Sequence, residues 1–377
     1  MKLIKFYNLN KLNKKYSKSF VEKFYKLNNI GRYIQGKNTE KFEENFAKFC
    51  KVKYAIAVGN CFDALVLSFK AYKTMKLLKD GDEVIVPTNT YIASVFSITE
   101  VNLKPIFVQP DINTFNLTAK EIAKHITKKT KAILAVDLYG HPADLINIKK
   151  LAKSKKLIFI EDAAQSQGAK IKNKMIGSIA DVTCFSFFPG KLMGAFGDAG
   201  AITTNNPKLY NIVKSTRNYG EKIYFDYQDR KYENIYYGVN SRMDELQAII
   251  LNEKLKDFSD QQKKRGRIIN YYLKNIKNKE IGLPMEKKGF KHAWHLFVVK
   301  TKFRDKLKKY LSNNGIQTMI HYPIPPYRQT IYKNIKVKNK IFSDNLNKQI
   351  LSLPVNSSLS MKDVKFVVNK INSFKLK

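Results

Sequence analysis

The 377-residue sequence has only three cysteines, which are widely separated: Cys50, Cys61 and Cys184. An odd number of scattered cysteines argues against a disulfide framework or a zinc knuckle, so we expect reduced thiols. The sequence also lacks an uncharged apolar run long enough to cross a bilayer, and its first residues lack the apolar stretch of a signal peptide. We therefore expect a cytoplasmic protein with no membrane partner.

Acidic residues are also scarce, because 31 Asp and Glu stand against 69 Lys and Arg, for a net charge of +38. An excess of this sign is typical of nucleic-acid binders when it is clustered. Here the lysines are spread along the whole chain, and arginine, the preferred reader of phosphates and guanines, is a minority among the basic residues. We therefore expect no nucleic-acid partner, and a basic nucleic-acid-binding or regulatory protein is the alternative of a different class.

Short apolar runs rich in β-branched residues recur over the first part of the chain, separated in several places by segments with helical spacing. Strands alternating with helices predict an α/β fold, with a mostly parallel sheet covered by helices on both faces. The expected strands lie near 54–58, 83–87, 105–109, 131–139, 157–162, 181–187 and 199–204, and the expected helices near 62–76, 118–127 and 144–155.

The remainder of the chain predicts a smaller domain. Residues 241–276 have the pattern of one or two long helices leaving the sheet, followed by a strand at 292–300 and a helix near 303–313. We therefore predict a large α/β domain over residues 1–250, which includes an N-terminal helical segment, and a small α+β domain over residues 251–377.

Three segments carry candidate chemistry. A strand runs into Gly59, Asn60 and Cys61 and then a helix, whose free N–H groups suit a phosphate, although a plain turn and cap explains the pattern equally well. A second strand ends in a carboxylate, Asp162, and the carboxyl ends of strands are where open α/β sheets bind ligands. Alternatively, that carboxylate only caps the next helix.

The third segment, FSFFPGKLMGAFGDAGA at 185–201, places Lys191 among aromatic and small apolar residues. Partial desolvation there would lower the pKa of the amine and make it a better nucleophile, whereas a lysine extending from a turn into solvent is the simpler alternative. Together, a phosphate site, a carboxylate and an amine are the groups that pyridoxal phosphate requires.

At this point the sequence resembles a known family. EDAAQSQGA, GSIADVTCFSFFPGKLMGAFGDAGAI, NSRMDELQA, HYPIP and LSLPV are similar to motifs of the DegT/DnrJ/EryC/StrS sugar aminotransferases. The resemblance extends over nearly the whole chain, and implies fold type I of the pyridoxal phosphate enzymes, which is the aspartate aminotransferase-like fold. It also implies pyridoxal 5'-phosphate as cofactor, with pyridoxamine phosphate as the intermediate form.

The resemblance assigns roles to individual residues. Lys191 matches the lysine that bonds covalently to the cofactor and moves protons, and Asp162 matches the partner of the pyridine nitrogen. The other implied cofactor contacts are Gln165 at the ring hydroxyl, Tyr91 stacked on the ring, and Gly59, Asn60, Cys61, Ser186 and Asn240 around the phosphate. Asn240 would come from a second subunit, which implies a homodimer with a shared active site. His321 and Tyr322 are candidates for substrate contacts, and for His321 a loop position without a ligand is an equal alternative.

The implied reaction is transamination, because Lys191 stands where a dehydratase branch of the family has histidine. The amino donor would be L-glutamate, and the acceptor the C3 ketone of a dTDP-3-keto-6-deoxyhexose, since GNCFDAL is closest to members with this specificity. A 4-aminotransferase acting on a 4-keto nucleotide sugar is the alternative. Cys61 and Asp137 depart from the family pattern, which affects the expected sugar more than the reaction class. The product would enter glycan or lipopolysaccharide biosynthesis.

A metal site is the remaining alternative. His292 and His295 have a spacing that would place both on one helix face, but HAWHLFVV has the pattern of a strand, and no clustered acid or cysteine completes a ligand set. We therefore expect no metal.

Overall fold

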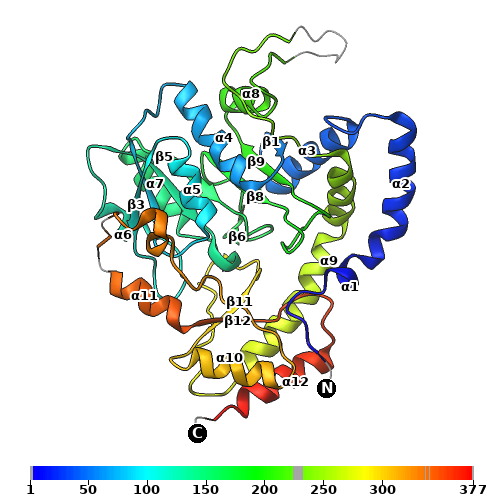
Figure 1. Ribbon diagram of the computed structural model, residues 1–377, viewed down its shortest axis with the longest axis vertical. Helices are drawn as coiled ribbons and strands as arrows, with labels where there is room; N and C mark the ends of the chain where they lie inside the picture. Colours follow the sequence, from blue (N-terminus) through cyan, green and yellow to red (C-terminus); the bar gives the residue numbers. More distant parts are fainter. Residues whose placement is uncertain (1–2, 224–231, 336, 339, 376–377) are drawn as a thin grey trace.

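The computed structural model describes residues 3–223, 232–335, 337–338 and 340–375. A seven-stranded sheet with helices on both sides forms its centre (Figure 1). The pairings from β8 to β3 are parallel, and β9 runs antiparallel to both of its neighbours. The predicted α/β fold with a mostly parallel sheet is confirmed. In spatial order the strands are β1 (Tyr54–Val58), β9 (Gly200–Thr204), β8 (Val182–Ser186), β5 (Ile158–Asp162), β4 (Thr130–Val136), β2 (Glu83–Pro87) and β3 (Lys104–Val108).

Alternate side chains of the strands enter two apolar cores. In β1, Ile56 and Val58 belong to one core and Ala55 and Ala57 to the other, as the period of two in a strand requires. The helices that contribute to the first core are α4 (Cys61–Thr74), α5 (Ile92–Thr99) and α8 (Pro207–Thr216). Those that contribute to the second are α3 (Lys37–Cys50), α6 (Ala119–Ala123), α7 (Leu145–Ser154) and the first half of α9 (Glu245–Asn275).

Two predicted elements end earlier than the sequence pattern suggests. The strand expected over 131–139 stops at Val136, because the chain turns at Tyr139, whose φ is +63°, and forms the short 3-10 helix η2 (Leu138–Gly140). The helix expected over 118–127 covers only Ala119–Ala123.

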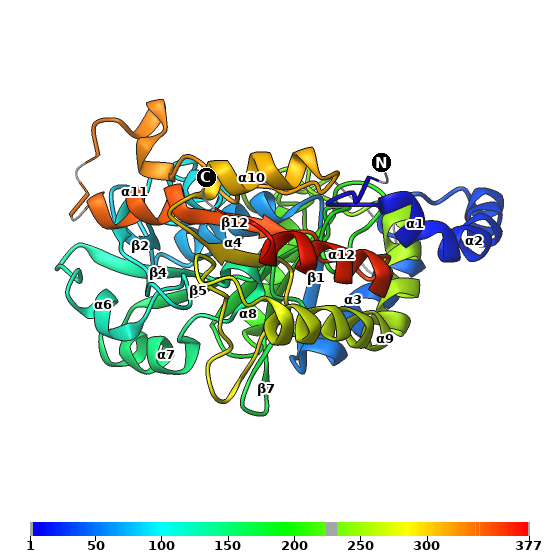
Figure 2. The same ribbon diagram turned by 90° about the horizontal axis from the view of Figure 1, so that it is seen from below.

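Helix α9 is one continuous helix that leaves the sheet and enters a second lobe (Figure 2). Its Ile268, Ile269 and Tyr272 pack into that lobe's own apolar core. Because α9 runs across position 250, the division into domains at 250 and 251 stays a prediction. The lobe also contains β11 (Phe297–Lys300), β12 (Ile350–Leu353), α10 (Arg304–Asn313), α11 (Lys340–Gln349) and α12 (Met361–Asn372), and two 3-10 helices, η3 (Pro326–Arg328) and η4 (Thr330–Tyr332), lie between α10 and α11.

The strand expected over 292–300 is shorter in the structure and begins only at Phe297. The preceding residues bend, with Trp294 at a φ of +54° and its ring stacked on His292 at 3.8 Å. The small remaining strands β6 (Lys170–Ile171), β7 (Lys174–Met175) and β10 (Phe290–Lys291) form a separate sheet.

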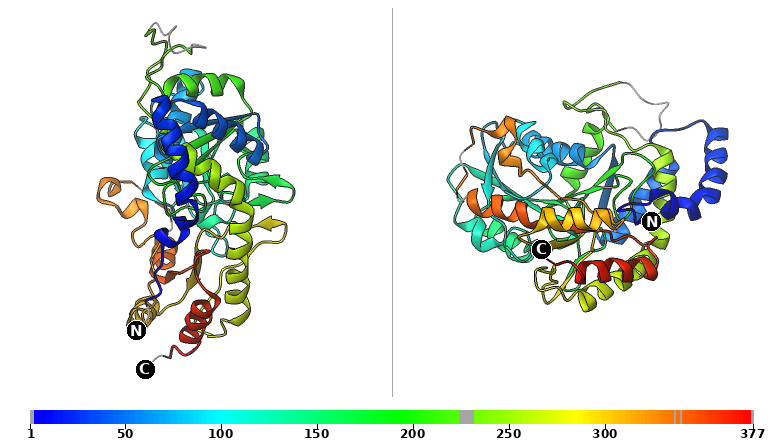
Figure 3. Two further views of the ribbon diagram at one scale, coloured as in Figure 1. Left: turned by 90° about the vertical axis from the view of Figure 1, so that its right-hand side faces the viewer. Right: turned by 60° about the horizontal axis from the view of Figure 1, so that its bottom comes forward.

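The N-terminal segment links the two lobes. Ile4 pairs with Ile316 and packs into the core of the second lobe, and the chain then returns along α9 (Figure 3). Its elements are α1 (Leu9–Asn13), η1 (Lys14–Tyr16) and α2 (Ser17–Ile30). Among the described residues, no helix combines the length and apolar character needed to cross a membrane.

The first turn of α9 supplies the cap of another helix. Helix α3 has Gly36 at its N-cap and no side-chain cap of its own. The buried Glu245 carboxylate accepts hydrogen bonds from the backbone N–H groups of Gly36 at 3.0 Å, Asn38 at 2.9 Å and Thr39 at 2.9 Å, as well as from two side chains. A Cβ at Gly36 would lie 2.9 Å from the Glu245 carboxyl carbon, so glycine permits this approach. The carboxylate therefore joins α3 to α9.

We predict that Glu245→Ala lowers the free energy of unfolding by about 3 kcal/mol, because it leaves several buried N–H donors without an acceptor. Urea unfolding followed by circular dichroism measures this change. Asp260→Ala, which removes an exposed carboxylate from the same helix, is the control and should change stability by less than about 0.5 kcal/mol. Equal stabilities for the two variants would contradict the capping role.

Candidate active site

The carboxyl end of β5 positions a buried carboxyl group, that of Asp162. Its Oδ2 accepts a hydrogen bond from Ser94 Oγ at 2.7 Å, and its Oδ1 accepts one from the backbone N–H of Ala164 at 3.0 Å. Burial raises the pKa of the Asp162 carboxyl, whereas these two hydrogen bonds and the charge of Lys191 lower it. The group can thus stabilise positive charge placed against it.

Lys191 lies in the loop that follows β8. This loop is tightly folded, since Lys191 N–H donates to the Phe188 carbonyl at 2.8 Å and a Cβ at Gly194 would lie 2.2 Å from the Pro189 carbonyl oxygen. Burial lowers the pKa of the Lys191 amine, opposed by Cys61 and Asp162. The partial desolvation predicted from the aromatic and apolar sequence around Lys191 therefore agrees with its half-buried position.

The predicted phosphate turn lies at the start of α4. Asn60 is its N-cap and accepts from the Asp63 N–H at 2.8 Å, which leaves the first N–H groups of the helix available to a ligand. Gly200 of β9 lies so close that a Cβ there would approach the Asn60 carbonyl carbon to 2.5 Å. Gly59 N–H donates to Ser241 Oγ at 3.0 Å, and Cys61 Sγ lies 4.0 Å from Asp162 Oδ1. The turn and the carboxyl therefore share one site.

A second set of polar residues lies beside this pair. Gln165 accepts from the Tyr139 N–H at 2.7 Å through Oε1 and donates to Tyr322 Oη at 3.0 Å through Nε2. The half-exposed Tyr91 lies at the N-terminus of α5, with its ring centre 5.2 Å from that of Tyr322. Tyr139 Oη in turn donates to the His321 carbonyl. Gln165, Tyr91, Tyr322 and His321 are thus brought together.

His321 itself is held in a defined position. Its Nδ1 lies 2.8 Å from Ser352 Oγ, and burial together with the charge of Lys191 lowers its pKa to about 4. The imidazole is therefore neutral at pH 7 and faces the same site as the lysine.

Two further residues predicted at the phosphate, Ser186 and Asn240, have other contacts within the chain. Ser186 ends β8, and its Oγ accepts from the Phe188 N–H at 3.3 Å. Asn240 is exposed and pairs with Asn218 through the backbone. Within the described part of the chain, no contact joins Asn240 to Lys191 or Asp162, so the role expected from a second subunit is a prediction that a single chain does not test.

Sequence reasoning missed several residues of the site. Ser94 follows Tyr91 by one helical turn, and this spacing is the signal that could have found it. Tyr139 gave no such signal, because its contacts depend on the turn after β4.

Two further carboxyl groups lie close to Asp162, because the Asp137 N–H donates to the Asp162 carbonyl at 3.0 Å and Glu161 precedes Asp162 in β5. Asp137 and Glu161 are both fully buried. Asp137 accepts from the Ala143 N–H at 2.8 Å and Ser166 Oγ at 2.8 Å, while Glu161 accepts from Thr183 Oγ1 at 2.7 Å. Burial raises the pKa of both carboxyls, and the repulsion between them raises that of Glu161 further. The pair therefore retains a proton at pH values where an exposed carboxyl is ionised.

Of the two histidines considered as metal ligands, His292 has other partners. His292 Nδ1 accepts from the Trp294 N–H at 2.7 Å, and its ring stacks on that indole. Over the described ranges, no group of three or more His, Cys, Asp or Glu is placed to hold a metal ion.

The donor set fits pyridoxal phosphate. The site contains a buried carboxyl for the pyridine nitrogen, a desolvated amine in Lys191, and a helix N-terminus that Gly200 allows β9 to approach closely. Asp162, Gln165 and the turn at Asn60 and Cys61 are the residues that would hold this cofactor.

Comparison with known proteins agrees with this geometry. Residues 14–372 match the DegT/DnrJ/EryC1/StrS aminotransferase family. The dTDP-3-amino-3,6-dideoxy-alpha-D-galactopyranose transaminase of Aneurinibacillus thermoaerophilus is 42% identical over 372 residues, covering 99% of each chain. Two similar solved structures are DesV of S. venezuelae in complex with a ketimine intermediate (33% identity, 99% and 98% coverage, TM-score 0.93) and NtdA of Bacillus subtilis with bound cofactor PMP (28%, 98% and 85%, TM-score 0.89).

The buried carboxyl pair yields a prediction on stability. Because the pKa values of Asp137 and Glu161 are raised in the folded chain, that chain binds more protons than the unfolded chain once the pH exceeds about 4, and stability falls as pH rises. We predict that Glu161→Gln reduces the loss of unfolding free energy between pH 4.5 and pH 7 by about 1 to 2 kcal/mol. Urea unfolding at both pH values measures it.

The exposed Glu100 provides the control, since Glu100→Gln should leave the pH dependence as in the wild type. The same pH dependence in Glu161→Gln and the wild type would show that the pair does not share a proton.

Proposed function

Because the chain belongs to the DegT/DnrJ/EryC1/StrS aminotransferase family, we propose that it transfers the amino group of L-glutamate to the C3 ketone of a dTDP-3-keto-6-deoxyhexose. The products would be a dTDP-3-amino-3,6-dideoxyhexose and 2-oxoglutarate. The protein is a pyridoxal phosphate-dependent nucleotide-sugar aminotransferase, as the sequence motifs predicted. The observation that carries the proposal is the buried carboxyl of Asp162 next to a desolvated Lys191 amine.

Bound pyridoxal phosphate supplies an electron sink for the carbon that loses its proton. Each nearby side chain then has a distinct task. Asp162, whose carboxyl is held in place by Ser94 and Ala164, would hold a proton at the pyridine nitrogen. Lys191, whose lowered pKa gives more of the neutral amine at pH 7, would take the proton from the donor α-carbon onto its Nζ and would then give it up to the carbon that is protonated in the same half-reaction.

The remaining predicted contacts extend this proposal. Gln165 would hold the ring hydroxyl, and Tyr91 would stack on the ring. Gly59, Asn60, Cys61 and Ser186 would surround the phosphate, with Asn240 added by a second subunit. His321 and Tyr322 would contact the sugar, since both lie next to Gln165 and Tyr139 at one side of the site.

The C3 position is supported by the transaminase relative at 42% identity, whose name gives a 3-amino sugar. The alternatives, a 4-aminotransferase and a nucleic-acid-binding or regulatory protein, are not favoured. The homodimer, the cytoplasmic location and the entry of the product into glycan or lipopolysaccharide biosynthesis stay predictions.

The test follows the visible absorbance of the purified holoenzyme. We expect L-glutamate to bleach it, and dTDP-3-keto-6-deoxyhexose to restore it, whereas a 4-keto nucleotide sugar leaves it bleached. Recovery with the 4-keto sugar alone would replace the proposed substrate but keep the reaction. A protein that stays colourless after incubation with pyridoxal phosphate would overturn the proposal.

Replacing the lysine gives a further prediction. Lys191→Ala should lower the rate of glutamate bleaching by about 10³-fold, the usual contribution of a positioned acid and base. Lys150→Ala, which changes an exposed lysine of α7, is the matched control and should react as the wild type. Similar rates for the two variants would exclude Lys191 as the proton carrier.

A further inference from the structure

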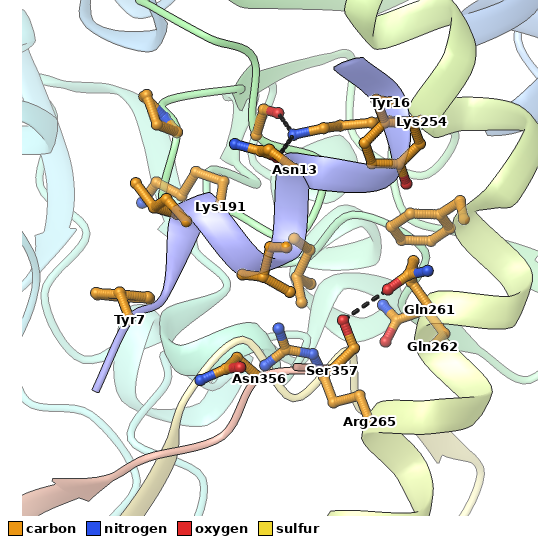
Figure 4. A pocket seen from close by; sticks show the side chains of 17 residues that line it. Tyr7, Asn13, Tyr16, Lys191, Lys254, Gln261, Gln262, Arg265, Asn356 and Ser357 are labelled. Carbon is orange, nitrogen blue, oxygen red and sulfur yellow. Dashed lines mark hydrogen bonds between the residues drawn. The ribbon is translucent and has the colours of Figure 1, made fainter. Parts of the chain in front are cut away.

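An open pocket lies beside Lys191, between its loop, the N-terminal segment and α9 (Figure 4). Its space is about 590 Å³ when the part open to solvent is included. Besides Lys191, two cationic side chains line it, Lys254 and Arg265. No aspartate or glutamate occurs among its described lining residues, so the charge of the walls is positive.

Arg265 is the better fixed of the two cations. Its Nη1 donates to the carbonyls of Val355 at 2.7 Å, Trp294 at 3.0 Å and His295 at 3.4 Å. Figure 4 shows the Arg265 side chain beside Asn356 and Ser357 in the lining of the pocket, and no carboxylate within the described ranges forms an ion pair with it. Burial lowers its pKa to about 10. Removing such a cation from water costs free energy unless an anion pairs with it.

Lys254 connects the pocket to the loop of the catalytic lysine. Its Nζ donates to Asn13 Oδ1 at 2.7 Å and to the carbonyl of Gly194, which belongs to the same loop as Lys191. Burial and the nearby charge of Lys15 lower its pKa to about 8, so the amine is still mostly charged at pH 7. Here too, the described residues contain no carboxylate within ion-pair distance.

The pocket borders the reaction site, because Lys191 is one of its lining residues. The charges of Lys191 and Arg265 both act on His295, whose pKa is lowered well below its usual range mainly by burial. Tyr7 also lines the pocket. The charge of Arg265 lowers the pKa of Tyr7, and Tyr7 in turn raises the pKa of Tyr322. A molecule in the pocket therefore lies within reach of the Lys191 amine.

We propose that this pocket binds a carboxylate of the amino donor, with Arg265 as its principal ligand and Lys254 as a second positive charge. The proposal rests on the proposed function, because a donor amino acid has to place its amino group at Lys191 while its carboxylates need cations close by. A guanidinium matches a carboxylate with two parallel hydrogen bonds, and its Nε and Nη2 are not used by the three carbonyls. The diphosphate of the nucleotide sugar is the competing anion.

The first experiment measures binding without catalysis. Glutarate, a dicarboxylate without an amino group, is titrated into the holoenzyme by calorimetry. We expect Arg265→Gln to weaken binding at least tenfold, Arg265→Lys to weaken it by less because the charge remains, and Lys254→Met to weaken it severalfold. Lys263→Met removes a charge from an exposed position of the same helix and should change binding less than twofold. Equal effects of Arg265→Gln and Lys263→Met would overturn the proposal.

The second experiment separates the two half-reactions. The glutamate concentration needed for half-maximal bleaching should rise at least tenfold in Arg265→Gln, while the recovery produced by the keto sugar in the pyridoxamine phosphate form changes less than twofold. A loss confined to the sugar half-reaction would assign the pocket to the diphosphate, and equal losses in both would assign Arg265 a structural role. Either result overturns the proposal. Thermal unfolding checks that the variants fold, and Arg265→Lys and Lys254→Met carry the test if Arg265→Gln does not fold.

The outcomes also separate this inference from the proposed function. Bleaching by glutamate that is unaffected in Arg265→Gln would remove the pocket assignment and keep the aminotransferase. Glutarate binding that depends on Arg265, in a holoenzyme that glutamate does not bleach, would keep the carboxylate site and remove L-glutamate as the donor.

Discussion

At the end of β5, the buried Asp162 carboxyl and the half-buried Lys191 amine act on each other's pKa values. Burying either group alone would be costly, and the surrounding structure offsets that cost. Ser94 donates to the Asp162 carboxyl because the start of α5 lies close to the end of β5. Lys191 lies near the same carboxyl because the loop after β8 folds back on itself. The register of the parallel strands therefore determines where the chemistry takes place.

The backbone around this pair is held by close approaches that allow little variation. Gly200 lets β9 pass within contact of Asn60, so the helix start at α4 lies beside the carboxyl. Farther away, Glu245 ties α3 to α9, the helix that joins the two lobes. The same helix carries Lys254 and Arg265, which means that its position against α3 also sets the distance between the lysine loop and the second lobe.

Most of the sheet could be predicted from the sequence, because parallel strands such as β2 and β5 are apolar runs bounded by turn residues, and a buried parallel strand needs nothing else. The site was predictable where a local motif marks it, as with Lys191 and Asp162. The site could not be predicted where its contacts join residues that only the tertiary structure brings together. His292 and His295 lie in a bend that a strand-like apolar pattern conceals, since the positive φ of Trp294 depends on packing rather than on local preference.

The charge of the chain illustrates the same limit. A net charge of +38 gives no function, because most of it is spread over exposed lysines that water screens. Lys254 and Arg265 differ from those lysines only in their surroundings, which composition does not reveal. Desolvation makes a single buried cation more selective for an anion than many exposed ones, since the anion replaces lost hydration. If the pocket binds the donor as proposed, selectivity depends on where α9 places Lys254 and Arg265, and not on how many charges the sequence contains.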